Sequence, residues 1–270
     1  MEIRELISFY NVARLRSVSK AARELEVGQS SVTIHVKKLE AEFEITPFDP
    51  IKRPIQLTPE GFTFMGLYRF PWQSVGVAGG LMLTIAMFSL AWAFPTFPGD
   101  EWCLLKVQSL ETVWLDSVAR AISSLGGIPI SASLIAGLTI SLILLKRRAD
   151  ALVVVLSVVP IILGHGLKEL VGRSRPEYLL TGPVPQSLSF PSGHTIYAVL
   201  FGGILIMLVG DLIQTRLIRL GLQVGLAFLI LAEGASRVYL GAHWPSDVVG
   251  GYVFGGIALL GLIWLRNQLA

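Results

Sequence analysis

Six apolar blocks, each close to the length of a membrane-spanning helix, occupy the chain from Val75 onward. The blocks run over Val75–Phe94, Ile128–Leu145, Ala151–Leu167, Thr195–Ile213, Leu220–Leu240 and Val248–Leu265. A helix needs about 20 apolar residues to cross a bilayer. The alternative is a soluble helical core, but buried soluble helices seldom follow one another with so few charges. The pattern therefore predicts an all-α protein, a bundle of six transmembrane helices.

The first 64 residues have a different composition, with nine Lys or Arg and nine Asp or Glu. We therefore expect a small separate domain over residues 1–64 and a membrane domain over 65–270. The first twenty residues lack the apolar core of a signal peptide, so the N-terminus is expected to stay in the cytoplasm. The single cysteine, Cys103, excludes a disulfide within one chain.

Basic residues between the blocks predict the orientation in the membrane. One side of a six-span arrangement carries Lys146, Arg147, Arg148, Arg216, Arg219 and Arg266. Cytoplasmic loops carry an excess of Lys and Arg, so this side is expected to be cytoplasmic. The opposite loop, residues 95–127, is acidic on balance, and Thr112–Leu125 within it has the pattern of an amphipathic helix at the membrane surface.

Three short polar segments fall at the outer ends of the blocks: Lys168–Pro176, Pro191–His194 and Ser236–Asp247. They supply cations and hydrogen-bond donors that suit a phosphate, because arginine donates two parallel hydrogen bonds and a helix N-terminus favours an anion. The expected phosphate-binding residues are Lys168, Arg175, Ser192, Gly193 and Arg237. Lys168 and Arg175 are seven residues apart and would share a face if the helix continued through both.

Two histidines complete this predicted site. His243 and Asp247 are four residues apart, so the carboxylate can hold one imidazole nitrogen and leave the other to attack phosphorus. His194 can protonate the leaving oxygen and then deprotonate a water molecule. No cluster of metal ligands is evident, so we expect no cofactor and no metal, with the cations standing where magnesium stands in many phosphoryl-transfer enzymes.

Other polar residues near these segments are given lesser roles. His165 is expected to be structural, and Arg173 and Glu169 to be supporting or surface groups. Glu233 lies within the fifth block, where a charge is expensive. It either pairs with a site cation or is protonated, and we assign it no catalytic role.

The three segments resemble the signature of the type-2 phosphatidic acid phosphatase family, which shares its site with vanadium haloperoxidases. That signature is Lys, six residues, Arg-Pro; then Pro-Ser-Gly-His; then Ser-Arg, five residues, His, three residues, Asp. The resemblance covers about Val75 to Leu265. It implies a phosphohistidine intermediate on His243, His194 as general acid and metal-free catalysis. It also implies a lipid phosphate substrate such as phosphatidate, phosphatidylglycerol phosphate or a polyprenyl diphosphate; six spans suit an acyl chain better than halide chemistry. An outward site modestly favours undecaprenyl diphosphate.

Residues 1–64 have a helix-turn-helix pattern. Ile7, Val12 and Leu15 predict a first helix, Ser19 a cap for a second over Lys20–Glu26, and Ser30 a cap for a third over Ser31–Phe43. A wing strand is expected at Ile55–Thr58. The residues available to a DNA major groove are Ser31, Thr33, His35 and Lys37.

This segment resembles the winged DNA-binding head of LysR-type regulators over about 60 residues, through Ala21-Ala22, Ser30-Ser31, Leu39-Glu40 and Leu57–Gly61. It departs from that family at Pro47 and Pro50. The alternative function is thus a membrane-anchored DNA-binding regulator in which the phosphatase fold is a sensor or anchor. The opposite alternative is a fused head with no DNA role. Either way we expect a multi-pass protein of a bacterial inner membrane, with the membrane bilayer and a lipid phosphate as its partners.

Overall fold

The computed structural model describes residues 3–50, 52, 54–68, 72–178 and 187–269. The chain forms two compact units, Met1–Gln73 and Ser74–Ala270. The predicted boundary after residue 64 falls inside helix α4, Pro59–Tyr68. Each unit has its own core, so we describe the two separately.

The N-terminal unit is a helix-turn-helix arrangement of α1 (Ile3–Leu15), α2 (Val18–Glu24), α3 (Gln29–Phe43) and α4. Its core includes Val12, Ala21 and Val32. Helices α2 and α3 both begin two residues earlier than predicted. Ser17, not Ser19, caps α2 by accepting a hydrogen bond from the Lys20 amide. Gly28 stands at the N-cap of α3, so the predicted cap at Ser30 is also wrong.

The predicted wing strand is not confirmed. Phe48 and Leu57 form one isolated antiparallel bridge, and the described part of this unit contains no strand. Both side chains pack against a core cluster containing Phe9, Leu39 and Phe64. Packing against the helices therefore holds the segment in place without a sheet.

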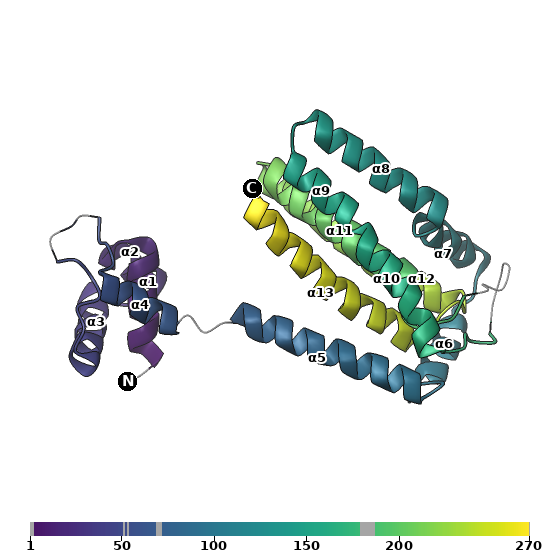
Figure 1. Cartoon of the computed structure of the whole chain (residues 1–270), viewed down its shortest axis with the longest axis horizontal. Coiled ribbons are helices and arrows are strands. Elements are labelled where there is room, and N and C mark those ends of the chain that lie inside the picture. The colour runs from purple at the N-terminus through teal and green to yellow at the C-terminus, as the bar shows by residue number, and fades with distance from the viewer. Residues whose placement is uncertain (1–2, 51, 53, 69–71, 179–186, 270) are drawn as a thin grey trace. The chain divides into compact units, whose positions relative to one another are not determined.

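The secondary-structure elements in the described part of the second unit are all helices (Figure 1). Its helices are α5 (Trp72–Ala93), α6 (Asp100–Gln108), α7 (Val113–Leu125), α8 (Ile128–Leu144), α9 (Arg148–Leu156), α10 (Val158–Val171), α11 (Gly193–Leu212), α12 (Arg216–Tyr239) and α13 (Pro245–Leu269). Five segments are long and apolar enough to cross a membrane: α5, α9 with α10, α11, α12 and α13. The pair α7–α8, bent by 51°, raises the number to six if it counts as one span. The predicted six spans are thus the upper end of this range.

Helix α11 is the centre of the bundle, and 61% of its span is buried. Ile196, Leu200 and Ile204 form much of the core along it. Close approach by α13 depends on Gly203, because a Cβ there would lie 2.2 Å from Leu259 Cδ2. The N-terminus of α11 is therefore held firmly against α12 and α13, and it carries the Gly193-His194 pair.

One end of the bundle is joined by a network of paired charges. Arg147 and Arg266 both pair with Asp150 and with Asp211. The network ties the α8–α9 junction to the ends of α11 and α13. These helix ends therefore meet at one end of the bundle.

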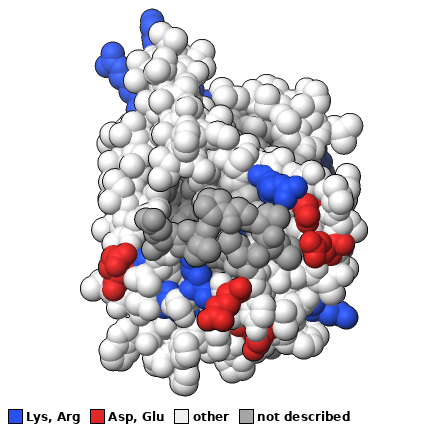
Figure 2. Space-filling model, turned by 90° about the vertical axis from the view of Figure 1, so that its right-hand side faces the viewer, with Lys and Arg blue, Asp and Glu red and all other residues white. Residues whose placement is uncertain are grey.

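The opposite end carries α6 and α7. Thr112 caps α7, because its hydroxyl accepts a hydrogen bond from the Leu115 amide at 3.2 Å, and the predicted helix over Thr112–Leu125 is confirmed. Val113 and Trp114 are exposed, whereas Ala119 and Ser123 are buried. Figure 2 shows this end, where acidic and basic side chains lie on a mostly uncharged surface.

Candidate active site

The first predicted segment leaves α10 and crosses the end of the bundle. Lys168 is in the last turn of α10, which ends at Val171 because Gly172 takes the left-handed conformation at φ +69°. The helix therefore does not continue through Arg175, and the condition for a shared helical face is not met. Lys168 and Arg175 still line the same cavity, because the chain folds back after Gly172.

The second segment begins α11. Ser192 caps this helix, and its hydroxyl accepts a hydrogen bond from Thr195 Oγ1 at 3.0 Å. Ser192 is fully buried and does not line the cavity, whereas Gly193 and His194 do. The positive end of the α11 dipole thus points at the cavity, which favours an anion there.

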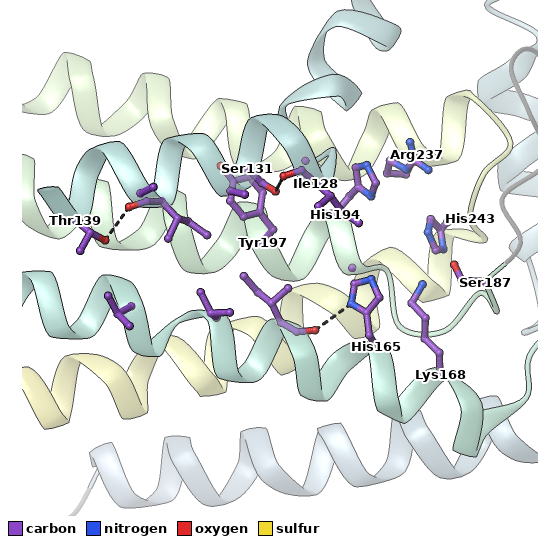
Figure 3. Close-up of a pocket in the computed structure, with 18 of the residues that line it drawn as sticks. Ile128, Ser131, Thr139, His165, Lys168, Ser187, His194, Tyr197, Arg237 and His243 are labelled. Carbon is purple, nitrogen blue, oxygen red and sulfur yellow. Dashed lines mark hydrogen bonds between the residues drawn. The ribbon is translucent and has the colours of Figure 1, made fainter.

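The third segment turns sharply between α12 and α13. Gly241 has φ +73°, and a Cβ there would lie 2.1 Å from the Tyr178 carbonyl oxygen, so only glycine fits this turn. The amides of Ala242 and His243 both donate to the carbonyl of Arg237, at 3.0 and 3.2 Å. The turn therefore places His243 beside Arg237 at the cavity wall (Figure 3).

The contacts of His243 define the state of its ring. Its Nε2 lies 3.2 Å from Arg175 Nη1, and a guanidinium can only donate, so Nε2 carries the lone pair. Its Nδ1 lies 3.4 Å from Asp247 Oδ2. Burial lowers the pKa of His243 well below its usual value, and the cations Lys168, Arg175 and Arg237 lower this pKa further. The ring is therefore neutral, with its basic nitrogen toward the cations.

Asp247 is held by Arg173, for which the sequence predicts either a supporting or a surface role. Arg173 donates to Asp247 Oδ1 and to Asp100 Oδ2, both at 2.7 Å, and it is almost completely buried. Its guanidinium also lies 4.9 Å from the centre of the Phe97 ring. Arg173 is thus a buried link between α6 and α13. The available signal was the acidic composition of the loop that contains Asp100.

Asp247 accepts further hydrogen bonds at its other oxygen. Oδ2 accepts from the Trp244 amide at 2.9 Å and from the Ser189 hydroxyl. The carboxylate is completely buried and is fixed at both oxygens before it meets His243. It can therefore hold one orientation of the His243 ring without moving.

The three cations at the cavity have only neutral hydrogen-bond acceptors. Lys168 donates to the Leu188 carbonyl at 3.0 Å, Arg175 to the Ser187 carbonyl at 2.6 Å, and Arg237 to the Ser123 hydroxyl. Within the described ranges none of the three forms a salt bridge with a carboxylate, in contrast to Arg173. Lys168 is buried and Arg175 and Arg237 are partly buried, and a fully buried charge without a counter-ion costs several kcal/mol. The cavity is therefore electrostatically incomplete without an anion.

The cavity continues from this charged end into an apolar groove (Figure 3). Its volume is about 670 Å³. Side chains of α8 form one wall and side chains of α9 and α10 form the other: Ile128, Ala132, Ile135, Ile140, Val155, Val158 and Ile161. The helical rise from Ile128 to Ile140 gives the groove a length of about 18 Å. A charged head with a hydrocarbon tail would match both parts.

These features define a helical membrane protein with an anion site built around histidines. The sequence pattern of the PAP2 superfamily matches residues 148–269. Phosphatidylglycerophosphatase B of Bacillus subtilis strain 168 is 30% identical over 146 residues, which are 53% of this chain and 70% of that protein. The chain belongs to the PAP2 superfamily of phosphatases.

Two further relatives agree with this assignment. Undecaprenyl-diphosphatase of Sulfolobus acidocaldarius is 33% identical over 115 residues, which are 40% of this chain and 51% of that protein. The crystal structure of a transmembrane PAP2-type phosphatidylglycerolphosphate phosphatase from Bacillus subtilis superposes with a TM-score of 0.62 at 25% identity, covering 71% of this chain and 97% of that one.

The N-terminal unit has relatives of its own. The pattern of bacterial regulatory helix-turn-helix proteins of the lysR family matches residues 3–62. The HTH-type transcriptional regulator CzcR of Bacillus subtilis is 43% identical over 61 residues, and the chain spans only 21% of that regulator's length. The N-terminal unit is therefore a LysR-type helix-turn-helix.

Proposed function

We propose that this protein hydrolyses a lipid phosphate or diphosphate through a phosphohistidine intermediate on His243. The observation that carries the proposal is a set of three cations, placed around His243 Nε2 at the end of an apolar groove, that form no salt bridge with any described residue. A phosphate dianion supplies the missing charge. The groove then accommodates the hydrocarbon chain attached to it.

In the first step, Nε2 of His243 forms a bond to phosphorus while the bond from phosphorus to the leaving oxygen breaks. Asp247 accepts the Nδ1 proton of His243 in a hydrogen bond and stabilises the charge that develops on the ring. His194 donates its proton to the leaving oxygen. Lys168, Arg175 and Arg237 stabilise the equatorial oxygens, whose charge grows in the transition state.

In the second step, water attacks the phosphohistidine. His194, now neutral, takes a proton from this water as the new bond to phosphorus forms. The bond between phosphorus and His243 Nε2 breaks, and inorganic phosphate leaves. His194 ends the cycle protonated and His243 neutral, as both began.

Phosphate release by the purified protein tests this proposal. The substrates are phosphatidate, phosphatidylglycerol phosphate and undecaprenyl diphosphate, each with and without a chelator. We expect turnover that persists in chelator and is blocked by vanadate, since the cations do the work of a metal. Full turnover by a His243→Ala variant would show that the nucleophile is wrongly assigned.

Among these lipids we propose undecaprenyl diphosphate as the preferred substrate. The proposal rests on an outward-facing site and on the similarity to an undecaprenyl-diphosphatase. The similarity to phosphatidylglycerophosphatase B supports the second candidate, phosphatidylglycerol phosphate. A higher kcat/KM for the diphosphate than for both monophosphates is the expected result of the panel.

We also propose that the site lies on the outer face of a bacterial inner membrane, with the N-terminus in the cytoplasm. Cysteine labelling in intact cells tests this after replacement of Cys103 by serine. A Glu177→Cys variant near the site should react with an impermeant reagent, and an Arg216→Cys variant at the opposite end should not. The reverse pattern would place the site in the cytoplasm.

The match to the lysR family favours a second function, membrane-anchored DNA binding by the N-terminal unit. Thr33 and Lys37 are exposed on α3, whereas Ser31 is half-buried and the Nδ1 atom of His35 lies 2.8 Å from the Ser8 hydroxyl. Selective retention of DNA by the full-length protein, lost in Lys37→Ala, would support this function. Unchanged phosphatase activity in the same variant would show that DNA binding is not needed for catalysis.

A further inference from the structure

Glu233 is a buried carboxylate that the mechanism above does not use. It lies on α12 one turn before Arg237, its exposed fraction is 3%, and neither of its oxygens has a hydrogen-bond partner among the described residues. A carboxylate within a membrane span is expensive, and such residues usually face the functional interior. A buried polar group without a partner calls for a physical explanation.

The other unpartnered atoms lie close to Glu233. In the part of the chain that the structure describes, the remaining buried side-chain atoms without hydrogen bonds are the Tyr197 hydroxyl and Arg237 Nε. Both residues line the catalytic cavity, and both interact electrostatically with Glu233. The buried side-chain atoms without hydrogen-bond partners among the described residues therefore all lie at one side of the active site.

Glu233 and His194 meet at the space left by Gly126, the residue between α7 and α8. A Cβ at position 126 would lie 2.6 Å from Glu233 Oε1 and 2.5 Å from His194 Cδ2. No side chain therefore separates the carboxylate from the imidazole. Glycine at this junction permits the approach.

A half-turn of the His194 ring about its Cβ–Cγ bond exchanges Cδ2 with Nδ1. Both orientations are low in energy, because this torsion is roughly two-fold. After the half-turn, Nδ1 faces Glu233 and can donate a hydrogen bond to it. The same half-turn moves Nε2 to the place of Cε1, and Nε2 is then the nitrogen left to exchange a proton with the substrate, which is the same division of roles that Asp247 imposes on His243.

We propose that Glu233 is a positioning residue for His194: it accepts the Nδ1 hydrogen and stabilises the imidazolium that begins the reaction. This inference rests on the proposed function, in which His194 is the general acid. An imidazolium beside Lys168, Arg175 and Arg237 needs a nearby negative charge, and Glu233 supplies one. During turnover the Nε2 proton passes to the leaving oxygen and is replaced from water, while the Nδ1 proton stays with Glu233.

The dependence of rate on the leaving group tests the proposal. kcat/KM covers the steps up to departure of the leaving group, so hydrolysis of the intermediate does not affect it. Nitrophenolate leaves without a proton, whereas phenolate needs one. In Glu233→Gln, kcat/KM should fall about a hundredfold for phenyl phosphate and within about threefold for 4-nitrophenyl phosphate. An equal loss on both esters, or no loss on either, would overturn the proposal.

A double-mutant cycle on phosphatidate provides the second test. Because Glu233 acts through His194, Glu233→Gln should cost no further activity in a His194→Asn background. Additive losses would overturn the proposal. Gly126→Ala, which separates the two side chains, should reproduce the leaving-group effect. Gly225→Ala on α12, where a Cβ meets nothing within 4 Å, is the control and should match the wild type.

The two proposals can fail separately. If the wild type cleaves both aryl esters but no lipid phosphate, the proposed substrate class is wrong, and the ratio of the two aryl rates still decides the role of Glu233. If lipid turnover is normal and the cycle is additive, only the role of Glu233 is wrong. Melting temperatures of all variants, measured alongside, identify any loss that comes from misfolding.

Discussion

Two buried cations at the same end of the bundle should respond to the same substitution in opposite ways. Arg173 pairs with Asp100 and Asp247, whereas Lys168 donates to the Leu188 carbonyl and forms no salt bridge with a described residue. Both side chains are almost fully buried, at 2% and 3% exposure. Replacing each by methionine removes the charge and keeps most of the apolar length. Comparison of the two variants therefore isolates the effect of a carboxylate partner on stability.

The magnitudes follow from what each substitution leaves behind. Arg173→Met leaves two buried carboxylates without their shared cation, and breaking a buried pair in this way costs about 3–5 kcal/mol. For a unit of 150–250 residues each kcal/mol lowers the melting temperature by about 2–4 °C, so the expected loss is roughly 6–20 °C. Lys168→Met instead removes a charge that Arg175 and Arg237 repel. We expect its melting temperature to equal or exceed that of the wild type.

Thermal unfolding of the detergent-solubilised protein, with and without vanadate, measures both effects. Vanadate should raise the melting temperature of the wild type, because a ligand bound only to the folded state stabilises it, and this rise should be absent in Lys168→Met. Both variants should lose activity. Arg216→Met, an exposed arginine at the opposite end, should change stability by less than about 0.5 kcal/mol. Equal destabilisation by the Arg173 and Lys168 substitutions would refute the distinction between paired and unpaired cations.

Three further predictions concern the turn that carries His243. Burial and the neighbouring cations lower the pKa of His243 in the folded protein. Below the ordinary histidine pKa of about 6.5 the unfolded chain therefore binds a proton that the folded protein does not, and the free energy of unfolding falls by up to about 1.4 kcal/mol for each pH unit. The melting temperature should drop less between pH 7 and pH 5 in His243→Gln than in the wild type. Asp247→Asn should lower kcat by about 10²–10⁴-fold in phosphate-release assays, because an amide does not enforce the Nδ1-protonated ring. Gly241→Ala should destabilise the protein by at least about 1–3 kcal/mol in thermal melts, since it forces a side chain into a left-handed turn and against the Tyr178 carbonyl; an unchanged melting temperature would contradict the role given to this turn.

The sequence pattern predicted those helices whose formation depends on their own residues more than on contacts with distant segments. The spans of α11, α12 and α13 were predicted from runs of apolar residues, because burial in lipid requires such runs whatever the neighbours are. The amphipathic α7 was predicted from its pattern of apolar and polar residues, and the structure adds its Thr112 cap. The starts of α2 and α3 were predicted two residues late, because a cap was expected at Ser19 and Ser30, whereas Ser17 and Gly28 stand at these positions.

Contacts between distant segments could not be predicted in the same way. The spacing of Lys168 and Arg175 suggested a common helical face, yet α10 ends at Gly172 and the two cations meet through a loop. For Arg173 the sequence could not decide between a supporting and a surface role, because its partners, Asp100 and Asp247, are 73 and 74 residues away. Glu233 and His194 are separated along the chain, and only the fold brings them together at Gly126. Sequence spacing specifies neighbours along one helix, whereas this site is built between helices.

The distribution of charge over the bundle argues that the site is prepared for a dianion before one arrives. At the end opposite the site, Arg147 and Arg266 form salt bridges with Asp150 and Asp211. At the site itself, Arg173 forms salt bridges with Asp100 and Asp247. Cations that served only as membrane anchors would extend to water. The three cations at the cavity are instead fixed by carbonyl and hydroxyl oxygens, which hold their positions without neutralising their charge. Such an arrangement needs no reorganisation when charge develops on a transferring phosphoryl group, and this is the condition under which electrostatic stabilisation is most effective.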